Sequence, residues 1–149
     1  MESSAASLVV KCPKCGSNNR VRFSKAVEQK PVCGKCKASL PVGGQPVTVT
    51  DANFGEVVEK SSLPVLLDMW AAWCGPCRMI APTIKALAKE MAGRVVVGKM
   101  DVDANPRTSS RYGVQSIPTL LIFKGGREAE RIVGVQSKEA VLNRLQKYL

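Results

Sequence analysis

The sequence predicts an α/β domain, built on a central mixed sheet flanked by helices, behind a small cysteine-rich N-terminal domain. Apolar runs at 64–70 and 95–100 are separated by a helical pattern, so we expect two buried strands that pair in parallel. Residues 119–123 and 128–134 flank a glycine-containing turn and indicate an antiparallel hairpin. Four of the six cysteines fall within residues 12–36, which sets the first part of the chain apart.

The α/β part is expected to begin with an edge strand at 47–49 and a short helix that Asp51 caps, with apolar residues at positions 54, 57 and 58. A long helix follows Cys77, and Pro82 is expected to kink it because proline removes one internal hydrogen bond. Gly93 ends that helix. A short helix at 104–112 and a last helix from about Ser137 follow, and the last one is expected to bury Val141, Leu142 and Leu145.

The domain boundaries follow from composition. We expect a flexible tail at 1–7, a metal-stabilised ribbon at 8–40, a linker at 41–50 and the α/β domain at 51–149. The first 40 residues hold few large apolar side chains, and so small a unit usually needs a metal or disulfides to fold. Proline and glycine are dense at 41–46, as is typical of a linker.

The segment Cys74-Gly75-Pro76-Cys77 lies where the strand at 64–70 gives way to a helical pattern. Two cysteines at the first turn of a helix can close a small disulfide ring, and the helix N-terminus stabilises a thiolate on the first sulfur. Cys74 is therefore the expected nucleophile and Cys77 the resolving thiol. An inert buried pair, or half of a zinc site shared with the N-terminal cysteines, are the alternatives.

Residues 51–149 closely resemble the thioredoxin family. The resemblance rests on residues in the family's order and spacing, namely Asp68, Trp70, Trp73 to Cys77, Pro82, Lys99, Ile117 to Thr119, Gly126 and Gly134. It implies the thioredoxin fold and the reduction of protein disulfides by dithiol exchange. The same fold also serves oxidases and isomerases according to redox poise, and Gly75-Pro76 favours the reductant by resemblance.

The resemblance also implies roles around the dithiol. Asp68 would be the buried acid that helps deprotonate Cys77, with Lys99 as its nearby partner, whereas an Asp hydrogen-bonded to neighbouring backbone is the alternative. Most X-Pro bonds are trans, but the resemblance implies a cis bond before Pro118 in a loop that faces the dithiol. The residues expected to bind substrate are Trp73, Gly75, Pro76, Ile117, Pro118 and Thr119. Packing alone is the alternative role for Trp73.

The N-terminal cysteines form two C-x-x-C pairs, Cys12/Cys15 and Cys33/Cys36, with 17 residues between Cys15 and Cys33. This spacing is typical of a four-cysteine zinc site, and the chain has no histidine, so such a site must be all-thiolate. We expect one structural Zn²⁺ held by the four thiolates, with two local disulfides or unmetallated thiols as alternatives. A zinc ribbon ahead of a thioredoxin domain resembles the thioredoxin 2 family.

Charge is unevenly distributed along the chain. The formal net charge is +10; residues 1–50 carry eight basic and two acidic side chains, a net of +6, and residues 51–149 carry 14 and 10, a net of +4. Phe23 is the only aromatic residue among the first 50, which does not favour single-stranded nucleic acid as a partner. A solvated basic face that steers acidic partners fits better.

Partners and compartment follow from the resemblance and from the motifs. The resemblance implies reduction by thioredoxin reductase and disulfide-containing proteins as substrates. The chain has no glycine-rich dinucleotide fingerprint, so we expect no bound nicotinamide or flavin. No secretory leader and no apolar run of ~20 residues is evident, so we expect a soluble, monomeric cytoplasmic protein. A redox-sensing zinc protein that binds a partner or nucleic acid is the alternative from another class.

Overall fold

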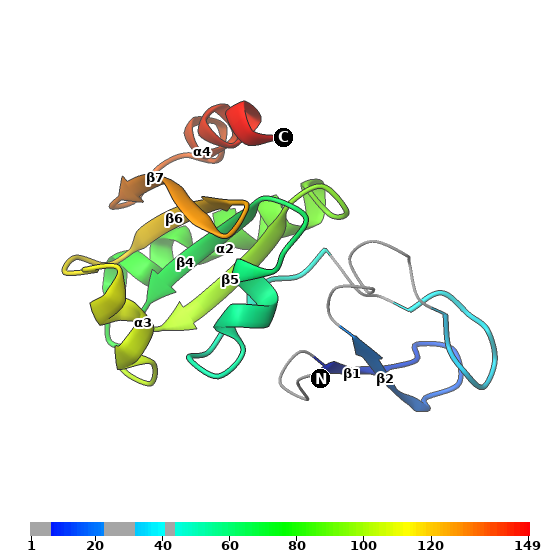
Figure 1. Cartoon of the computed structure of the whole chain (residues 1–149). Helices are drawn as coiled ribbons and strands as arrows, with labels where there is room; N and C mark the ends of the chain where they lie inside the picture. Colours follow the sequence, from blue (N-terminus) through cyan, green and yellow to red (C-terminus); the bar gives the residue numbers. More distant parts are fainter. Residues whose placement is uncertain (1–6, 23–31, 41–43) are drawn as a thin grey trace.

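The computed structural model describes residues 7–22, 32–40 and 44–149 (Figure 1). In chain order, its elements are β1 (Ser7–Lys11), β2 (Asn18–Arg22), β3 (Val47–Thr48), the π-helical turn η2 (Gly55–Glu59), β4 (Val65–Trp70), α2 (Gly75–Glu90), β5 (Val96–Asp101), α3 (Pro106–Arg111), β6 (Thr119–Lys124), β7 (Arg127–Val133), α4 (Lys138–Leu145) and the 3-10 turn η3 (Gln146–Tyr148).

The central sheet has five strands in the order β3-β5-β4-β6-β7. β4 pairs in parallel with β5 and antiparallel with β6, and β6 and β7 form the expected hairpin. The expected edge strand is present as β3, which pairs in parallel with β5. The mixed sheet predicted from the sequence is therefore confirmed, with β4 at its centre.

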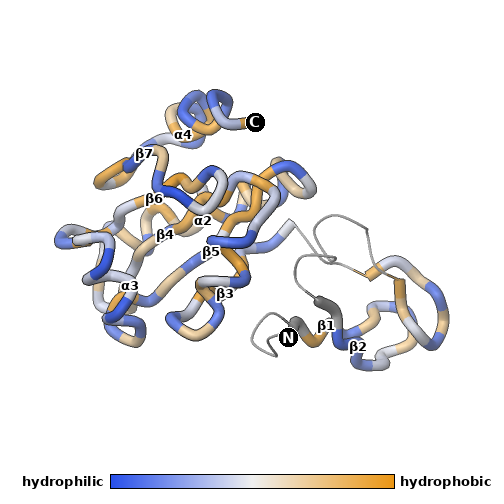
Figure 2. Tube along the Cα trace, in the orientation of Figure 1, coloured by the Kyte–Doolittle hydropathy of each residue, from blue (hydrophilic) through white to orange (hydrophobic). Residues whose placement is uncertain are grey.

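The sheet is buried on both faces because its central strands are apolar almost throughout (Figure 2). Successive side chains of a strand point to opposite faces. Leu66 of β4 and Ile122 of β6 accordingly pack in one core with the buried residues of α2 and α4. Leu67 and Phe123 pack in a second core with residues of η2. β4 is therefore packed on both of its faces, and its C-terminal end leads to the dithiol.

The long helix and the last helix lie where the sequence predicts them, and one residue of the last helix differs in its burial. Helix α2 is continuous from Gly75 to Glu90, with Pro82 inside it, and ends before Gly93. Ser137 caps α4, since its hydroxyl accepts a hydrogen bond from the Ala140 N–H at 3.2 Å. Val141 and Leu145 are buried as expected, but Leu142 is only partly buried at the edge of the core.

Asp51 does not cap its own helix, which corrects the sequence expectation. Its carboxylate instead accepts hydrogen bonds from the N–H groups of Arg107 and Thr108 and from the Thr108 hydroxyl, all at the start of α3. Asn105, which stands at the N-cap of α3, accepts a bond from the Asp51 N–H at 2.8 Å. Asp51 thus caps the N-terminus of a helix that lies more than 50 residues further along the chain.

Candidate active site and cysteine cluster

The dithiol lies at the N-terminus of α2. Cys74 stands at the N-cap position, and Cys74 and Cys77 are joined by a disulfide with Cα atoms 5.3 Å apart. The Cys77 N–H donates a hydrogen bond to Cys74 Sγ at 3.2 Å. Once the disulfide is reduced, this N–H group and the positive end of the helix dipole both stabilise a thiolate on Cys74. Gly75 and Pro76 form the first turn of the helix, where proline needs no N–H partner.

The loop before β6 faces this dithiol. The bond between Ile117 and Pro118 is cis, as the resemblance implied, and the Ile117 carbonyl oxygen lies 3.8 Å from Cys74 Sγ. Ile117 is partly buried against the two cysteines, whereas Pro118 is buried. Thr119 is also buried, and its hydroxyl donates to the Ser116 carbonyl, so its side chain supports the loop from beneath.

Asp68 is a carboxyl buried in the central strand β4. Its exposed fraction is 1%, and neither carboxylate oxygen has a partner within the described part of the chain. The alternative of an Asp bonded to neighbouring backbone therefore finds no support. Burial raises the pKa of Asp68 from 3.8 to about 6, and the positive charge of Lys99 opposes that rise. Asp68 shares a strand face with Leu66, the face that α2 covers.

The two tryptophans differ in their surroundings. Lys99 Nζ lies over the Trp70 ring, 4.6 Å from the centroid, and Trp70 packs against the dithiol cluster. Trp73, by contrast, is 69% exposed, although its indole N–H donates to Asp103 at 2.7 Å. An exposed indole held by one hydrogen bond leaves an apolar ring facing solvent beside the dithiol.

Asp103 is a site residue that the sequence analysis missed. Its own backbone N–H donates to the Asp101 carboxylate, which fixes the turn after β5. The signal available in the sequence was an acidic pair, Asp101 and Asp103, at the end of a strand parallel to β4, and the carboxyl ends of parallel strands meet at one edge of a sheet.

The four N-terminal cysteines lie together, with their sulfur atoms all within 4.8 Å of one another. The two pairs repeat one backbone pattern. The Gly16 N–H donates to the Cys12 carbonyl as the Lys37 N–H donates to that of Cys33, both at 2.9 Å. Both donors have positive φ, 79° at Gly16 and 65° at Lys37. Two matching turns therefore present two sulfurs each to one centre.

The cluster has the dimensions of a metal site. Four sulfurs at ~2.3 Å from a tetrahedral zinc lie about 3.8 Å from one another. The sulfurs of Cys12 and Cys36 are 3.6 Å apart, and those of Cys15 and Cys33 are 3.7 Å apart. Asn19 donates to Cys33 Sγ at 3.6 Å and accepts from the Gly34 N–H at 3.0 Å, as an outer-shell residue would. The donor set and spacing fit a tetrahedral thiolate-bound ion.

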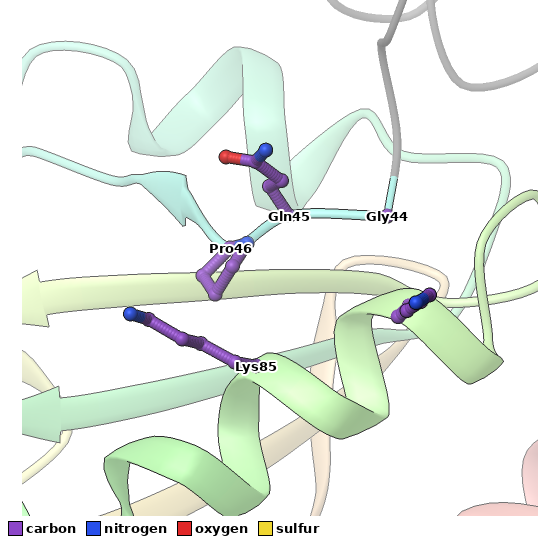
Figure 3. Close-up of a pocket in the computed structure, with 5 residues that line it drawn as sticks. Gly44, Gln45, Pro46 and Lys85 are labelled. Carbon is purple, nitrogen blue, oxygen red and sulfur yellow. The ribbon is translucent and has the colours of Figure 1, made fainter.

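A pocket of about 300 Å³ lies between Gly44–Pro46 and helix α2, lined by Lys85 and Lys89 (Figure 3). Figure 3 shows the Lys85 side chain extending beneath Pro46. Lys85 is eight residues, or about 12 Å of helix, beyond Cys77. The pocket is therefore separate from the dithiol.

Comparisons with known proteins place these features in a family. The thioredoxin family matches residues 45–147 of the chain. The chain is 50% identical over 101 residues to a thioredoxin of Synechocystis, covering 68% of this chain and 94% of that protein. It is 52% identical over 93 residues to a thioredoxin of Alicyclobacillus acidocaldarius, covering 62% and 88%. A chloroplastic M-type thioredoxin of Chlamydomonas reinhardtii is 38% identical over 137 residues, 92% of each chain.

The chain belongs to the thioredoxin family. It is a thiol-disulfide oxidoreductase with a Cys-Gly-Pro-Cys active site, Cys74 to Cys77, on the thioredoxin fold. The N-terminal cysteine cluster is a possible metal site. Among the helices that the structure describes, none is long and apolar enough to cross a bilayer.

Proposed function

We propose that this protein is a zinc-ribbon thioredoxin of the thioredoxin 2 type, which reduces protein disulfides in the cytoplasm. The observation that carries this proposal is the Cys74–Cys77 disulfide at the start of α2, beside the cis-Pro118 loop, in a chain of the thioredoxin family. Residues 8–40 would form the ribbon, 41–50 the linker and 51–149 the catalytic domain, with the end of the linker supplying the edge strand β3 of the catalytic sheet.

In the first step, the Cys74 thiolate attacks one sulfur of a target disulfide. A mixed disulfide forms, and the first target sulfur leaves as a thiolate that takes a proton from solvent. Cys74 suits this role because the Cys77 N–H already points at its sulfur. The substrate chain would lie along Ile117–Thr119 and the turn Gly75–Pro76, with the exposed indole of Trp73 against it.

In the second step, Cys77 resolves the mixed disulfide. Its thiol gives a proton to Asp68, its sulfur attacks Cys74 Sγ, and the second target sulfur leaves as a thiolate. Two electrons pass from the dithiol to the target. Asp68 suits proton acceptance because a buried carboxyl with a pKa of about 6 is ionised at neutral pH yet binds a proton readily. Lys99 would keep this pKa from rising further. Thioredoxin reductase, drawing on NADPH, would return the oxidised protein to the dithiol.

The ribbon would hold one Zn²⁺ through Cys12, Cys15, Cys33 and Cys36. The sulfur spacing and the matching turns support this ligand set. Four protein ligands leave no open coordination position, so the ion would stabilise the fold of the ribbon and take no part in the thiol exchange.

The test follows the fate of a disulfide substrate. With reductase and NADPH, the parent protein should turn over a protein disulfide and Cys74→Ser should not. Cys77→Ser should still attack and accumulate a mixed disulfide on Cys74, visible by mass spectrometry. A target trapped on Cys77 in the Cys74→Ser protein, with none on Cys74 in the reciprocal variant, would reverse the two roles. Metal analysis of the same parent sample should give one zinc per chain.

A further inference from the structure

The described N-terminal residues present only positive charge to solvent. Residues 7–22 and 32–40 contain no aspartate or glutamate. Their exposed charged side chains, which we call the ribbon cations, are Lys11, Lys14, Arg20, Lys35 and Lys37. Figure 2 shows hydrophilic stretches along this part of the chain. Lys14 and Lys35 hold the same position in the two C-x-K-C turns, so both lie next to the sulfur cluster.

Among the residues that the structure describes, the ribbon cations make no ion pair, whereas six of the 14 basic side chains in the catalytic domain do. There, surface cations such as Arg144 and Lys138 pair with Glu130 and Glu90. Within the described residues, Lys14 and Lys35 make no ion pair or side-chain hydrogen bond, and Lys37 donates only to the Gly34 carbonyl at 3.4 Å. Like charges without opposite charges between them, carried by so small a unit, add their fields instead of cancelling.

Bound zinc would not cancel the positive charge of the ribbon. Four thiolates and one Zn²⁺ carry a formal charge of −2, whereas the two described segments carry six basic residues, at positions 11, 14, 20, 22, 35 and 37. The ribbon surface therefore stays cationic when the metal is bound.

We propose that the ribbon cations recruit oxidised substrates whose disulfide is flanked by acidic residues. The inference rests on the proposed function and adds a substrate class to it. An acidic substrate held on the ribbon would stay close to the tethered catalytic domain, and its effective concentration at the dithiol would rise. The preference would appear in KM, because the thiol chemistry itself is unchanged.

The surface fits an acidic protein segment better than a nucleic acid. Proteins that bind single strands without sequence preference stack bases on aromatic side chains. No phenylalanine, tyrosine or tryptophan lies in residues 7–22 or 32–40. Point charges on flexible lysine stems suit scattered carboxylates instead.

The experiment compares two disulfide peptides that differ only in their flanks, one with Asp and Glu, the other with Asn and Gln. The full-length zinc-loaded protein is assayed with reductase and NADPH at 20 and 300 mM salt. At low salt, Lys14→Glu/Lys35→Glu should raise KM for the acidic peptide about tenfold with unchanged kcat, and KM for the neutral peptide less than twofold. High salt should remove the difference, because the Debye length shortens.

Two control variants isolate the position of the charge. Lys85→Glu/Lys89→Glu makes the same charge change on the exposed face of α2 (Figure 3), and it should leave KM for both peptides within twofold. Lys14→Arg/Lys35→Arg keeps the charge and should keep the parent KM. Each variant is assayed only after its zinc content matches that of the parent.

Binding is measured separately from turnover. A Cys74→Ser/Cys77→Ser protein should bind the fluorescent acidic peptide more tightly than the neutral one by anisotropy, and Lys14→Glu/Lys35→Glu should abolish that difference. Failure of the parent to reduce even the neutral peptide would refute the proposed function, while this binding assay still decides on the ribbon. Three outcomes would overturn the inference. Lys14→Glu/Lys35→Glu could change KM equally for both peptides, or the α2 control could change KM as much as the ribbon variant does. The third is tighter binding of a single-stranded oligonucleotide than of the acidic peptide.

Discussion

Asp68 and Lys99 occupy the same register position on neighbouring parallel strands, yet the Lys99 ammonium lies over the Trp70 ring and the Asp68 carboxylate has no hydrogen-bond partner among the described residues. A carboxylate buried without a hydrogen bond is costly in its charged form. Burial without a partner therefore makes the ionised form of Asp68 destabilising for the folded domain.

Asp68→Asn should therefore stabilise the protein above pH 6. Because the folded pKa of about 6 exceeds the ordinary 3.8, the unfolded chain ionises first, and the parent loses stability as pH rises from about 4 to about 6. The full loss is about 3 kcal/mol at ~1.36 kcal/mol per pH unit. Urea unfolding of both oxidised proteins, followed by fluorescence of the two tryptophans, should show the variant's advantage grow by about that amount between pH 4 and 7. An advantage that does not change with pH would contradict it.

The same substitution should slow resolution of the mixed disulfide. An amide cannot accept the Cys77 proton, so the single-turnover rate of release near pH 7 should fall about 100-fold, the lower end of general-base contributions. In the parent, this rate should also fall as pH drops below about 6, where Asp68 becomes protonated. Attack by Cys74, measured in a Cys77→Ser background, serves as the control and should be little affected. Equal release rates for variant and parent from pH 6 to 9 would exclude the proton-transfer role.

Gly126 should be far less tolerant of alanine than its neighbour Gly125. Both have positive φ, 81° and 61°, in the turn between β6 and β7. A Cβ on Gly126 would lie 2.7 Å from the Glu59 carbonyl oxygen, whereas a Cβ on Gly125 would meet nothing within 4 Å. Gly125→Ala should cost about 1 kcal/mol for the left-handed backbone alone. Gly126→Ala should cost about 1–3 kcal/mol more because of the overlap with Glu59. Thermal unfolding that ranks the two variants equally would refute the clash.

Much of this architecture could be predicted because its causes are local. The apolar runs of β4 and β6, the hairpin turn and the C-x-x-C turns are each set by residues within a few positions. Asp51 was assigned to the wrong helix because a capping residue looks the same in sequence whichever helix it caps. Asp103 is likewise not evident from the sequence, because its partner Trp73 lies 30 residues away and only the fold brings the two together. The cis bond before Pro118 followed from resemblance alone, because no local signal distinguishes it.

Asp51→Ala should loosen α3. The Asp51 carboxylate accepts from the N–H groups of the second and third residues of that helix, which is the role of an N-cap side chain. Its loss should lower the free energy of unfolding by about 1 kcal/mol and speed amide exchange in α3. Asp51→Asn retains an oxygen acceptor and should cost less than half as much. Unchanged exchange in α3 with Asp51→Ala would contradict the capping role of Asp51.

Asn19→Ala should weaken zinc binding although asparagine is not a ligand. Its side chain contacts Cys33 Sγ and the Gly34 N–H, so it orients one sulfur and the turn that carries it. Loss of such an outer-shell residue typically reduces metal affinity 10- to 100-fold, and we expect a reduction of about tenfold. Asn18, exposed at the start of β2, offers the matched control, and Asn18→Ala should leave the affinity within twofold. Competition with a chromophoric chelator measures the zinc affinity of both variants. Tryptophan fluorescence should stay constant in both, because Trp70 and Trp73 report only on the catalytic domain, which has its own core. Equal affinities for the two variants would contradict the positioning role, and a chain that binds no zinc at all would remove the site itself.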